Sequence, residues 1–115
     1  MAASPTLRPE VREMSTDIVA EVRAEVAAIP AGSVASYGDI AEWIGTSPRQ
    51  VGRAMSLLDE GVPWWRVVHA DGTPATCHQG RAPRLLADEG IPMRGTRVDM
   101  RRARHRREGP VPPSP

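Results

Sequence analysis

Hydrophobic residues recur at every third or fourth position near the start of the chain, at Val11, Met14, Ile18, Val22 and Val26. This spacing predicts an amphipathic helix with one apolar face. The helix has to end before Pro30, because a proline disfavours the helical conformation of the residue that precedes it. The sequence Pro30-Ala31-Gly32 then predicts a turn.

A second, shorter helix is predicted from its end signals. Ser36 followed three positions later by Asp39 matches a capping box, in which each residue caps the other's backbone amide. Gly45 marks the end, since glycine tolerates the left-handed conformation that closes many helices. The buried side of this helix is predicted to consist of Ile40, Ala41 and Ile44.

A third helix is predicted directly after the second. Ser47 is a typical N-cap, Pro48 fits the first helical position, and Gln50 lies three residues after the cap. The inward-facing stripe is predicted to be Val51, Met55 and Leu58. Two helices joined by a short glycine-containing turn are typical of a helix-turn-helix, with a simple helical hairpin as the alternative.

Basic residues lie on the outward face of the third helix. Arg49, Arg53 and Ser56 follow one another at offsets of four and three, so they share one surface. Gly52 lies beside them and leaves room for a close backbone approach. In a helix-turn-helix the second helix normally meets DNA, which favours DNA contact over an ordinary solvated surface.

The remainder of the chain predicts a small β wing and a last helix. Trp65 to Val68 is apolar and β-prone, Asp71-Gly72 is a turn signal, and a short hairpin is expected to run through Thr76. A brief helix is predicted over Pro83–Glu89 and is ended by Gly90. The predicted fold class is mainly α with a small β wing, a winged helix-turn-helix.

Length and charge divide the chain into three parts. Its 115 residues suffice for one domain, predicted over 10–100, with a flexible segment before it and a basic, proline-rich, disordered tail over 101–115. The net charge is only +1, but all fifteen basic residues are arginine, and five of them lie between 101 and 107. This run either follows DNA phosphates or is a solubilising tail. Acidic residues gather in the first helix, at Glu10, Glu13, Asp17, Glu21 and Glu25.

Other classes of protein are disfavoured by what the sequence contains. Cys77 is the one cysteine, so neither an internal disulfide nor a four-cysteine zinc site is available. No apolar run approaches the length of a membrane span, and residues 1–9 show no secretory pattern. We therefore expect a cytoplasmic protein with no membrane contact, no cofactor and no metal, and the predicted DNA contact makes it nucleoid-associated.

Four segments together resemble the DNA-binding domain of O6-alkylguanine-DNA alkyltransferases. They are, in order, IPAGSVASYGDIA (29–41), RQVGRAM (49–55), PWWRVV (63–68) and LLADEG (85–90). The resemblance spans about residues 11 to 98. It implies a domain that enters the minor groove of DNA and turns a damaged nucleotide out of the base stack.

The third of these segments departs from the alkyltransferase pattern. Trp64 stands at the position of the acceptor cysteine and Trp65 at that of the activating histidine. Alkyl transfer needs a thiolate activated by a base, and indole cannot replace it. The chain therefore resembles the alkyltransferase-like proteins, which bind alkylated guanine without repairing it and mark it for nucleotide excision repair. The implied protein is a monomer without enzymatic activity, and its partners are duplex DNA containing O6-alkylguanine and nucleotide excision repair proteins.

The same resemblance assigns roles to individual residues. Arg49 fills the gap left by the flipped nucleotide, and Tyr37 contacts its phosphate and helps to rotate it. The DNA-binding residues are predicted to be Ser36, Tyr37, Arg49, Gly52, Arg53 and Ser56. The lesion pocket is predicted to consist of Tyr37, Met55, Trp64, Ala75, Thr76, Cys77 and His78, with Trp64 stacking on the base.

Two residues of the alkyltransferase pattern keep their identity here without a catalytic partner. Glu89 matches the glutamate that orients the missing histidine, so we expect it to have lost its partner and to be structural. Arg66 is either a structural hydrogen-bond donor or a lesion contact, and Trp65 is either core or functional.

Alternative functions remain open at this stage. One is a winged-helix DNA-binding regulator without lesion preference, and another is an inhibitor that competes for lesions. A third is an alkyltransferase that uses Cys77, which is disfavoured because Cys77 and His78 would point to opposite faces of an extended segment. A metal site from Cys77, His78 and His69 lacks the spacing of ligand pairs.

Overall fold

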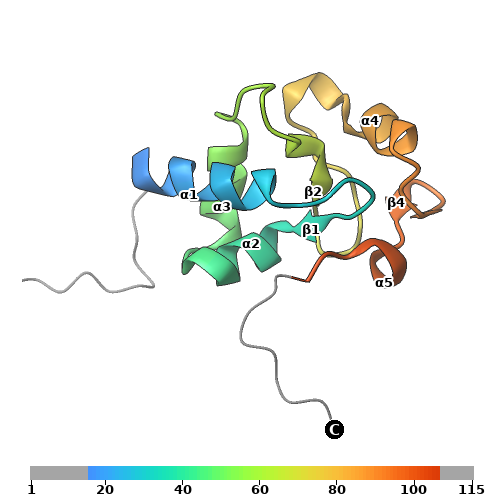
Figure 1. Cartoon of the computed structure of the whole chain (residues 1–115), viewed down its shortest axis with the longest axis horizontal. Coiled ribbons are helices and arrows are strands. Elements are labelled where there is room, and N and C mark those ends of the chain that lie inside the picture. Colours follow the sequence, from blue (N-terminus) through green and yellow to red (C-terminus); the bar gives the residue numbers. More distant parts are fainter. Residues whose placement is uncertain (1–15, 107–115) are drawn as a thin grey trace, which may run out of the picture.

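The computed structural model describes residues 16–106 as three packed helices joined to two small sheets and two further short helices (Figure 1). In chain order the elements are α1 (Thr16–Ala27), β1 (Ala35–Ser36), α2 (Tyr37–Ile44), α3 (Pro48–Met55), η2 (Trp64–Arg66), β2 (Val67–Val68), η3 (His78–Gly80), α4 (Ala82–Asp88), β3 (Met93–Arg94), β4 (Arg97–Val98) and α5 (Met100–Ala103). The predictions for residues 1–15 and 107–115 lie outside the described part of the chain.

Helices α1, α2 and α3 form the main hydrophobic core. The predicted stripe of α1 is buried in its described part, where Ile18, Val22 and Val26 have no exposed surface. Val51 and Met55 of α3 are equally buried and belong to the same cluster. The 3.6-residue period of the hydrophobic pattern therefore predicted correctly which face of each helix turns inward.

The predicted caps are all present. Ser36 Oγ accepts the Asp39 amide at 2.9 Å, and the Asp39 carboxylate accepts the Ser36 amide at 3.1 Å, which completes the capping box of α2. Gly45 closes α2 at φ 78°, in the left-handed region. Ser47 Oγ accepts the Gln50 amide at 3.2 Å and opens α3, with Pro48 in its first turn. The helix-turn-helix is thereby confirmed, and with it the mainly helical fold class.

The β structure is arranged differently from the predicted wing. β1 and β2 pair in parallel, Ala35 with Val67 and Ser36 with Val68. The strand β2 is short because residues 64–66, predicted in part to be extended, form a 3-10 turn. The segment after β2 makes a single bridge, from Val68 to Pro74, instead of a ladder. The antiparallel hairpin of the domain is β3–β4, further along the chain.

The prediction of disorder from residue 101 onward was wrong for residues 101–106. Asp99 caps α5 by accepting the Arg101 amide at 3.1 Å, and Ala103 is buried. The backbone then runs beside Val34, which donates to Ala103 O at 2.8 Å and accepts from His105 N at 2.6 Å. Backbone hydrogen bonds to Val34, just before β1, thus hold a segment whose arginine-rich composition alone indicated disorder.

Candidate nucleic-acid interface

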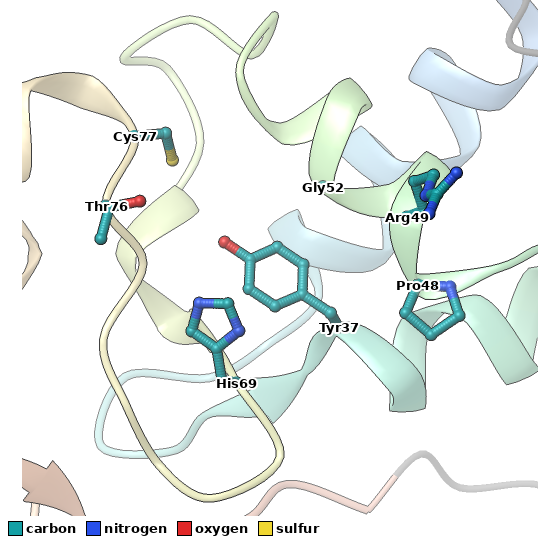
Figure 2. Close-up of a pocket in the computed structure, with 7 residues that line it drawn as sticks. All are labelled: Tyr37, Pro48, Arg49, Gly52, His69, Thr76 and Cys77. Atoms are coloured by element: carbon teal, nitrogen blue, oxygen red, sulfur yellow. The ribbon is translucent and has the colours of Figure 1, made fainter.

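A cavity of about 420 Å³ opens where α2, α3 and the segment after β2 meet (Figure 2). Its lining residues are Tyr37, Pro48, Arg49, Gly52, His69, Thr76 and Cys77. The helix-turn-helix supplies one side and residues 69–77 supply the other. The cavity therefore lies directly beside the helix that was predicted to meet DNA.

Tyr37 occupies the centre of this cavity. It is the first residue of α2, and its ring lies 4.9 Å from the ring of His69, centroid to centroid, at a tilt of 44°. Its hydroxyl points toward the segment that carries Thr76 and Cys77 (Figure 2). Burial, with a smaller contribution from Cys77, raises the pKa of Tyr37 to about 12. The hydroxyl is therefore a neutral hydrogen-bond donor at neutral pH.

The Asp39 carboxylate of the capping box at the start of α2 is stabilised in its ionised form. Burial of Asp39 acts to raise its pKa, but hydrogen bonds from Arg104 and from Ser36 outweigh burial, and the pKa lies below its ordinary value. Arg104 Nε donates to the Asp39 carboxylate at 3.0 Å. Ser36, predicted to touch DNA phosphate, is itself buried, so its backbone and hydroxyl are used within the protein.

The predicted outward face of α3 is exposed. Arg49 and Arg53 lie one turn apart on it, and Arg49 alone of the two lines the cavity. Ser56 ends the helix, with its hydroxyl donating to Arg53 O at 2.7 Å. A Cβ at Gly52 would come no nearer than 4.0 Å to Tyr37, so packing does not require glycine here, and its absence of a side chain leaves the cavity wider.

Trp64, predicted to be part of the lesion pocket, lies in the hydrophobic core with no exposed surface. Its indole stacks on His78, with ring centroids 4.1 Å apart and planes 11° apart, and Nε1 donates to Glu60 at 3.2 Å. The Arg81 guanidinium lies 5.6 Å from the ring centroid. A large apolar ring gains most from complete burial, which accounts for this placement.

The seven predicted pocket residues are therefore divided between two places. Tyr37, Thr76 and Cys77 line the cavity. Met55 and Ala75 are buried in the interior together with Trp64. His78 turns away from the cavity toward Trp64, and its Nε2 lies 2.7 Å from Leu58 O.

Pro48 and His69 are cavity residues that were not predicted to belong to the pocket. Pro48 was assigned only a helix-starting role. His69 carried a usable signal, because it is the first polar residue after the buried strand β2 and just before the Asp71-Gly72 turn. Its contact with Tyr37, however, joins segments that are distant in sequence.

Glu89 has a structural role, as expected, but it is not left without a partner. Arg66 Nε donates to both Glu89 carboxylate oxygens at 3.0 and 3.1 Å, and Arg66 also donates to Ile29 O at 2.8 Å. Arg66 is the main cause of a lowered Glu89 pKa. Arg66 does not line the cavity, which agrees with its structural interpretation.

Trp65 stands beside this ion pair. Its ring lies edge-on to Trp64 at 5.8 Å and 5.6 Å below the Arg66 guanidinium. Its buried indole N–H makes no hydrogen bond of ordinary geometry among residues 16–106, yet it helps to lower the pKa of Glu89. The indole of Trp65 carries no lone pair with which to accept a proton.

Cys77 is the one thiol in the sequence, and it lies half-buried in the cavity wall. Burial raises the pKa of its thiol. The protonated form therefore dominates at neutral pH, and a protonated thiol is a poor nucleophile.

Residues 17–91 match the family model described as 6-O-methylguanine DNA methyltransferase, DNA binding domain. The chain belongs to this family. It is 40% identical over 86 residues to a DNA base-flipping protein of Escherichia coli, covering 69% of this chain and 67% of that protein. It is 38% identical over 74 residues to alkyltransferase-like protein 1 of Schizosaccharomyces pombe, covering 57% and 68%.

Solved structures of this family share the fold. The crystal structure of S. pombe Atl1 in complex with damaged DNA containing O6-carboxymethylguanine matches with a TM-score of 0.71 and 27% identity, over 81% of this chain and 98% of that chain. The Mycobacterium tuberculosis O6-methylguanine methyltransferase matches with a TM-score of 0.58 and 34% identity, over 65% and 49%. The family members that it resembles thus include both an alkyltransferase-like protein and a methyltransferase.

Within residues 16–106, none of the helices has the length and apolar character needed to cross a bilayer. The same part of the chain contains no group of three or more histidine, cysteine, aspartate or glutamate side chains placed to hold a metal ion.

Proposed function

We propose that this protein recognises O6-alkylguanine in duplex DNA by flipping the damaged nucleotide out of the stack, and that it does not remove the alkyl group. Relatives named as a base-flipping protein and as an alkyltransferase-like protein support this function. The match to Atl1, solved with DNA containing O6-carboxymethylguanine, also supports it.

The observation that carries the proposal is the side chain at position 64. By the resemblance of residues 63–68, position 64 corresponds to the acceptor cysteine of an alkyltransferase, and this chain has there a fully buried tryptophan whose N–H is bonded to Glu60. The thiol that does reach the cavity, Cys77, has a raised pKa. Binding without transfer is the function that this arrangement supports, because none of the described residues that line the cavity is an activated nucleophile.

The cavity has the size and position for a flipped base. Its volume of about 420 Å³ lies within the usual range of small-molecule pockets, ~300–1,000 Å³. Tyr37 offers a neutral O–H inside it, suited to donating to a phosphate or a base acceptor. Arg49, exposed at the rim, is placed to enter the stack in place of the extruded nucleotide.

Paired duplexes test this function. Fluorescence polarisation would compare one duplex containing O6-methylguanine with the same duplex containing guanine, at physiological salt. Arg49→Ala is compared with Arg53→Ala, since both remove an exposed arginine from α3 but only Arg49 lines the cavity. We expect Arg49→Ala to lower lesion affinity by about tenfold or more, or ~1.4 kcal/mol, and to lower lesion preference with it. We expect Arg53→Ala to lower the affinity for both duplexes by the same factor and to leave the lesion preference unchanged.

Equal affinity of the wild-type protein for the two duplexes would overturn lesion recognition and leave a general winged-helix DNA binder. Intact-mass spectrometry after incubation with the methylated duplex tests the second part of the proposal. We expect an unchanged protein mass, whereas a stable gain of one methyl group would identify Cys77 as an acceptor.

We also propose that the protein acts as a monomer and that its complex with damaged DNA is the signal for nucleotide excision repair. This role needs access to chromosomal DNA, so the expected location is the cytoplasm, on the nucleoid. Light scattering after gel filtration tests the monomer. A reconstituted incision assay on an O6-alkylguanine duplex, with and without the protein, tests the handover, and an unchanged incision rate would contradict it.

A further inference from the structure

Arg104 connects the end of the described chain to the start of α2. Its Nε donates to the Asp39 carboxylate at 3.0 Å, and its guanidinium reaches the second carboxylate oxygen as well. The Asp39 side chain is 8% exposed, whereas that of Arg104 is 49% exposed. Arg104 lies beyond residue 91, where the family match ends.

The Asp39 carboxylate that Arg104 binds is part of the capping box at the N-terminus of α2. Asp39 accepts the Ser36 amide while its own amide donates to Ser36 Oγ. Tyr37, the central residue of the cavity, lies between these two residues in sequence and takes its direction from the same capping box. A displacement of Asp39 therefore displaces the backbone from which the Tyr37 ring projects.

The backbone beside Arg104 strengthens the same connection. Residues 103 and 105 exchange hydrogen bonds with Val34, and Arg104 bridges Val34 in a parallel sense. Val34 immediately precedes β1, which ends at Ser36 and leads directly into α2 (Figure 1). The segment 99–106 is thus attached to the start of α2 twice, once by backbone pairing and once by an ion pair.

We propose that Arg104 is a positioning residue for lesion recognition, which acts through Asp39 to hold Tyr37 at the orientation that the DNA contact requires. The proposal rests on the proposed function for its DNA readout. It differs from the interpretation of this arginine-rich segment as a set of phosphate contacts, because the charge of Arg104 is directed to a carboxylate of its own chain. A bidentate guanidinium fixes the plane of a carboxylate, which a lone positive charge does not.

Arg102 provides a matched control. It lies on α5, two residues before Arg104, it is exposed, and it forms no ion pair with any residue of the described range 16–106. Arg102→Gln and Arg104→Gln remove the same charge from the same segment. Only Arg104→Gln removes the contact with Asp39.

The first measurement is amide hydrogen exchange of the free protein, which needs no DNA. We expect Arg104→Gln to accelerate exchange of the Ser36 and Asp39 amides by about tenfold or more, since both depend on the capping box. The Gln50 amide, capped by Ser47 at the start of α3, should be unchanged. Unchanged protection of Ser36 and Asp39 in Arg104→Gln would overturn the proposal.

The second measurement is a double-mutant cycle on binding to the O6-methylguanine duplex. In the wild-type background we expect Tyr37→Phe to weaken binding by about tenfold, and in the Arg104→Gln background by less than about threefold, because Tyr37 is already misplaced there. Arg102→Gln should leave the Tyr37→Phe effect at its full size and only lower the salt dependence of binding. Additive effects of Arg104→Gln and Tyr37→Phe would overturn the proposal.

These readouts separate the failure of this proposal from that of the proposed function. If the wild-type protein shows no lesion preference, lesion recognition fails, and the exchange data together with a cycle on undamaged duplex still decide the role of Arg104. If circular dichroism shows that Arg104→Gln does not fold, Arg104→Lys replaces it, since lysine keeps the charge without the bidentate geometry.

Discussion

Arg66 and Glu89 form a bidentate ion pair that ties η2 to the end of α4, with side chains only 15% and 16% exposed. By the sequence resemblance, Glu89 corresponds to the glutamate that orients the activating histidine of the alkyltransferases, and Trp65 corresponds to that histidine. In this protein Arg66 engages the Glu89 carboxylate, so the pair fastens two elements together.

Breaking this pair is expected to destabilise the fold. Arg66→Ala should lower the free energy of unfolding by about 2 kcal/mol, because it leaves the partly buried Glu89 carboxylate without its partner and also frees Ile29 O. Urea denaturation followed by circular dichroism measures the change. Arg97→Ala is the control, since the Arg97–Asp71 pair is exposed and such pairs contribute ~0–1 kcal/mol. Equal effects of the two variants would refute the structural role of Arg66.

Restoring a cysteine at position 64 is not expected to restore alkyl transfer. In Trp64→Cys the new thiol would lie in the hydrophobic core and away from the cavity, because position 64 has no exposed surface and does not line the cavity. At the position of the activating histidine, Trp65 cannot accept its proton, and Glu89 stays paired with Arg66. The loss of the indole should also cost ~3–5 kcal/mol of stability, so folding is checked first. Intact-mass spectrometry with methylated duplex, in a Cys77→Ser background, measures transfer at position 64 alone. A methyl adduct would contradict the prediction.

Gly72 couples the segment that follows β2 to the hairpin β3–β4. It has φ +93°, and a Cβ there would lie 2.3 Å from Val98 O and 3.0 Å from Val98 N. Val98 cannot move away readily, because its amide donates to Gly72 O at 2.8 Å. Gly72→Ala should therefore cost about 2–4 kcal/mol, from the left-handed strain and the backbone clash together.

Gly80→Ala is the control for this substitution. Gly80 also has a positive φ, +68°, but a Cβ at this position would have no neighbouring atom within 4 Å. Only backbone strain applies there, at ~1 kcal/mol. Thermal unfolding of both variants distinguishes the contributions, and equal losses would show that the contact with Val98 is unimportant.

Tyr37 should titrate well above an ordinary tyrosine. Its pKa of about 12 means that the folded state keeps the proton after the unfolded chain, at ~10, has lost it. The stability associated with the neutral phenol is thus fully present below pH ~10 and is lost as the pH rises toward 12. Because the sequence has one tyrosine, tyrosinate absorbance reports on Tyr37 alone, with the denatured protein as reference.

Cys77→Ala refines the Tyr37 measurement. Burial is the larger cause of the raised pKa of Tyr37 and Cys77 the smaller, so most of the shift should persist in this variant. A folded protein whose Tyr37 titrates together with the denatured reference would show that partial burial does not raise the pKa of this residue.

The amino-acid sequence by itself determined the helix-turn-helix and its ends. The helix ends are marked by residues that act through hydrogen bonds and backbone preferences within three or four positions, so a local sequence pattern predicts them. These residues are Ser36 with Asp39, Gly45, and Ser47 with Pro48. The period of the buried positions in α1 and α3 is equally local. The family resemblance added the order of its motifs and the tryptophan at position 64, because these are matters of residue identity.

Only the tertiary structure decided which side chains meet. Arg104 lies 65 residues from Asp39, and Arg66 lies 23 residues from Glu89, so neither pair leaves a local pattern in the sequence. The same holds for the contact of His69 with Tyr37 and for the stacking of His78 on Trp64. Trp64 therefore lies in the core, although it was predicted to line the pocket. Local patterns report backbone geometry and which face is buried, whereas contacts between distant residues depend on how whole elements pack in three dimensions.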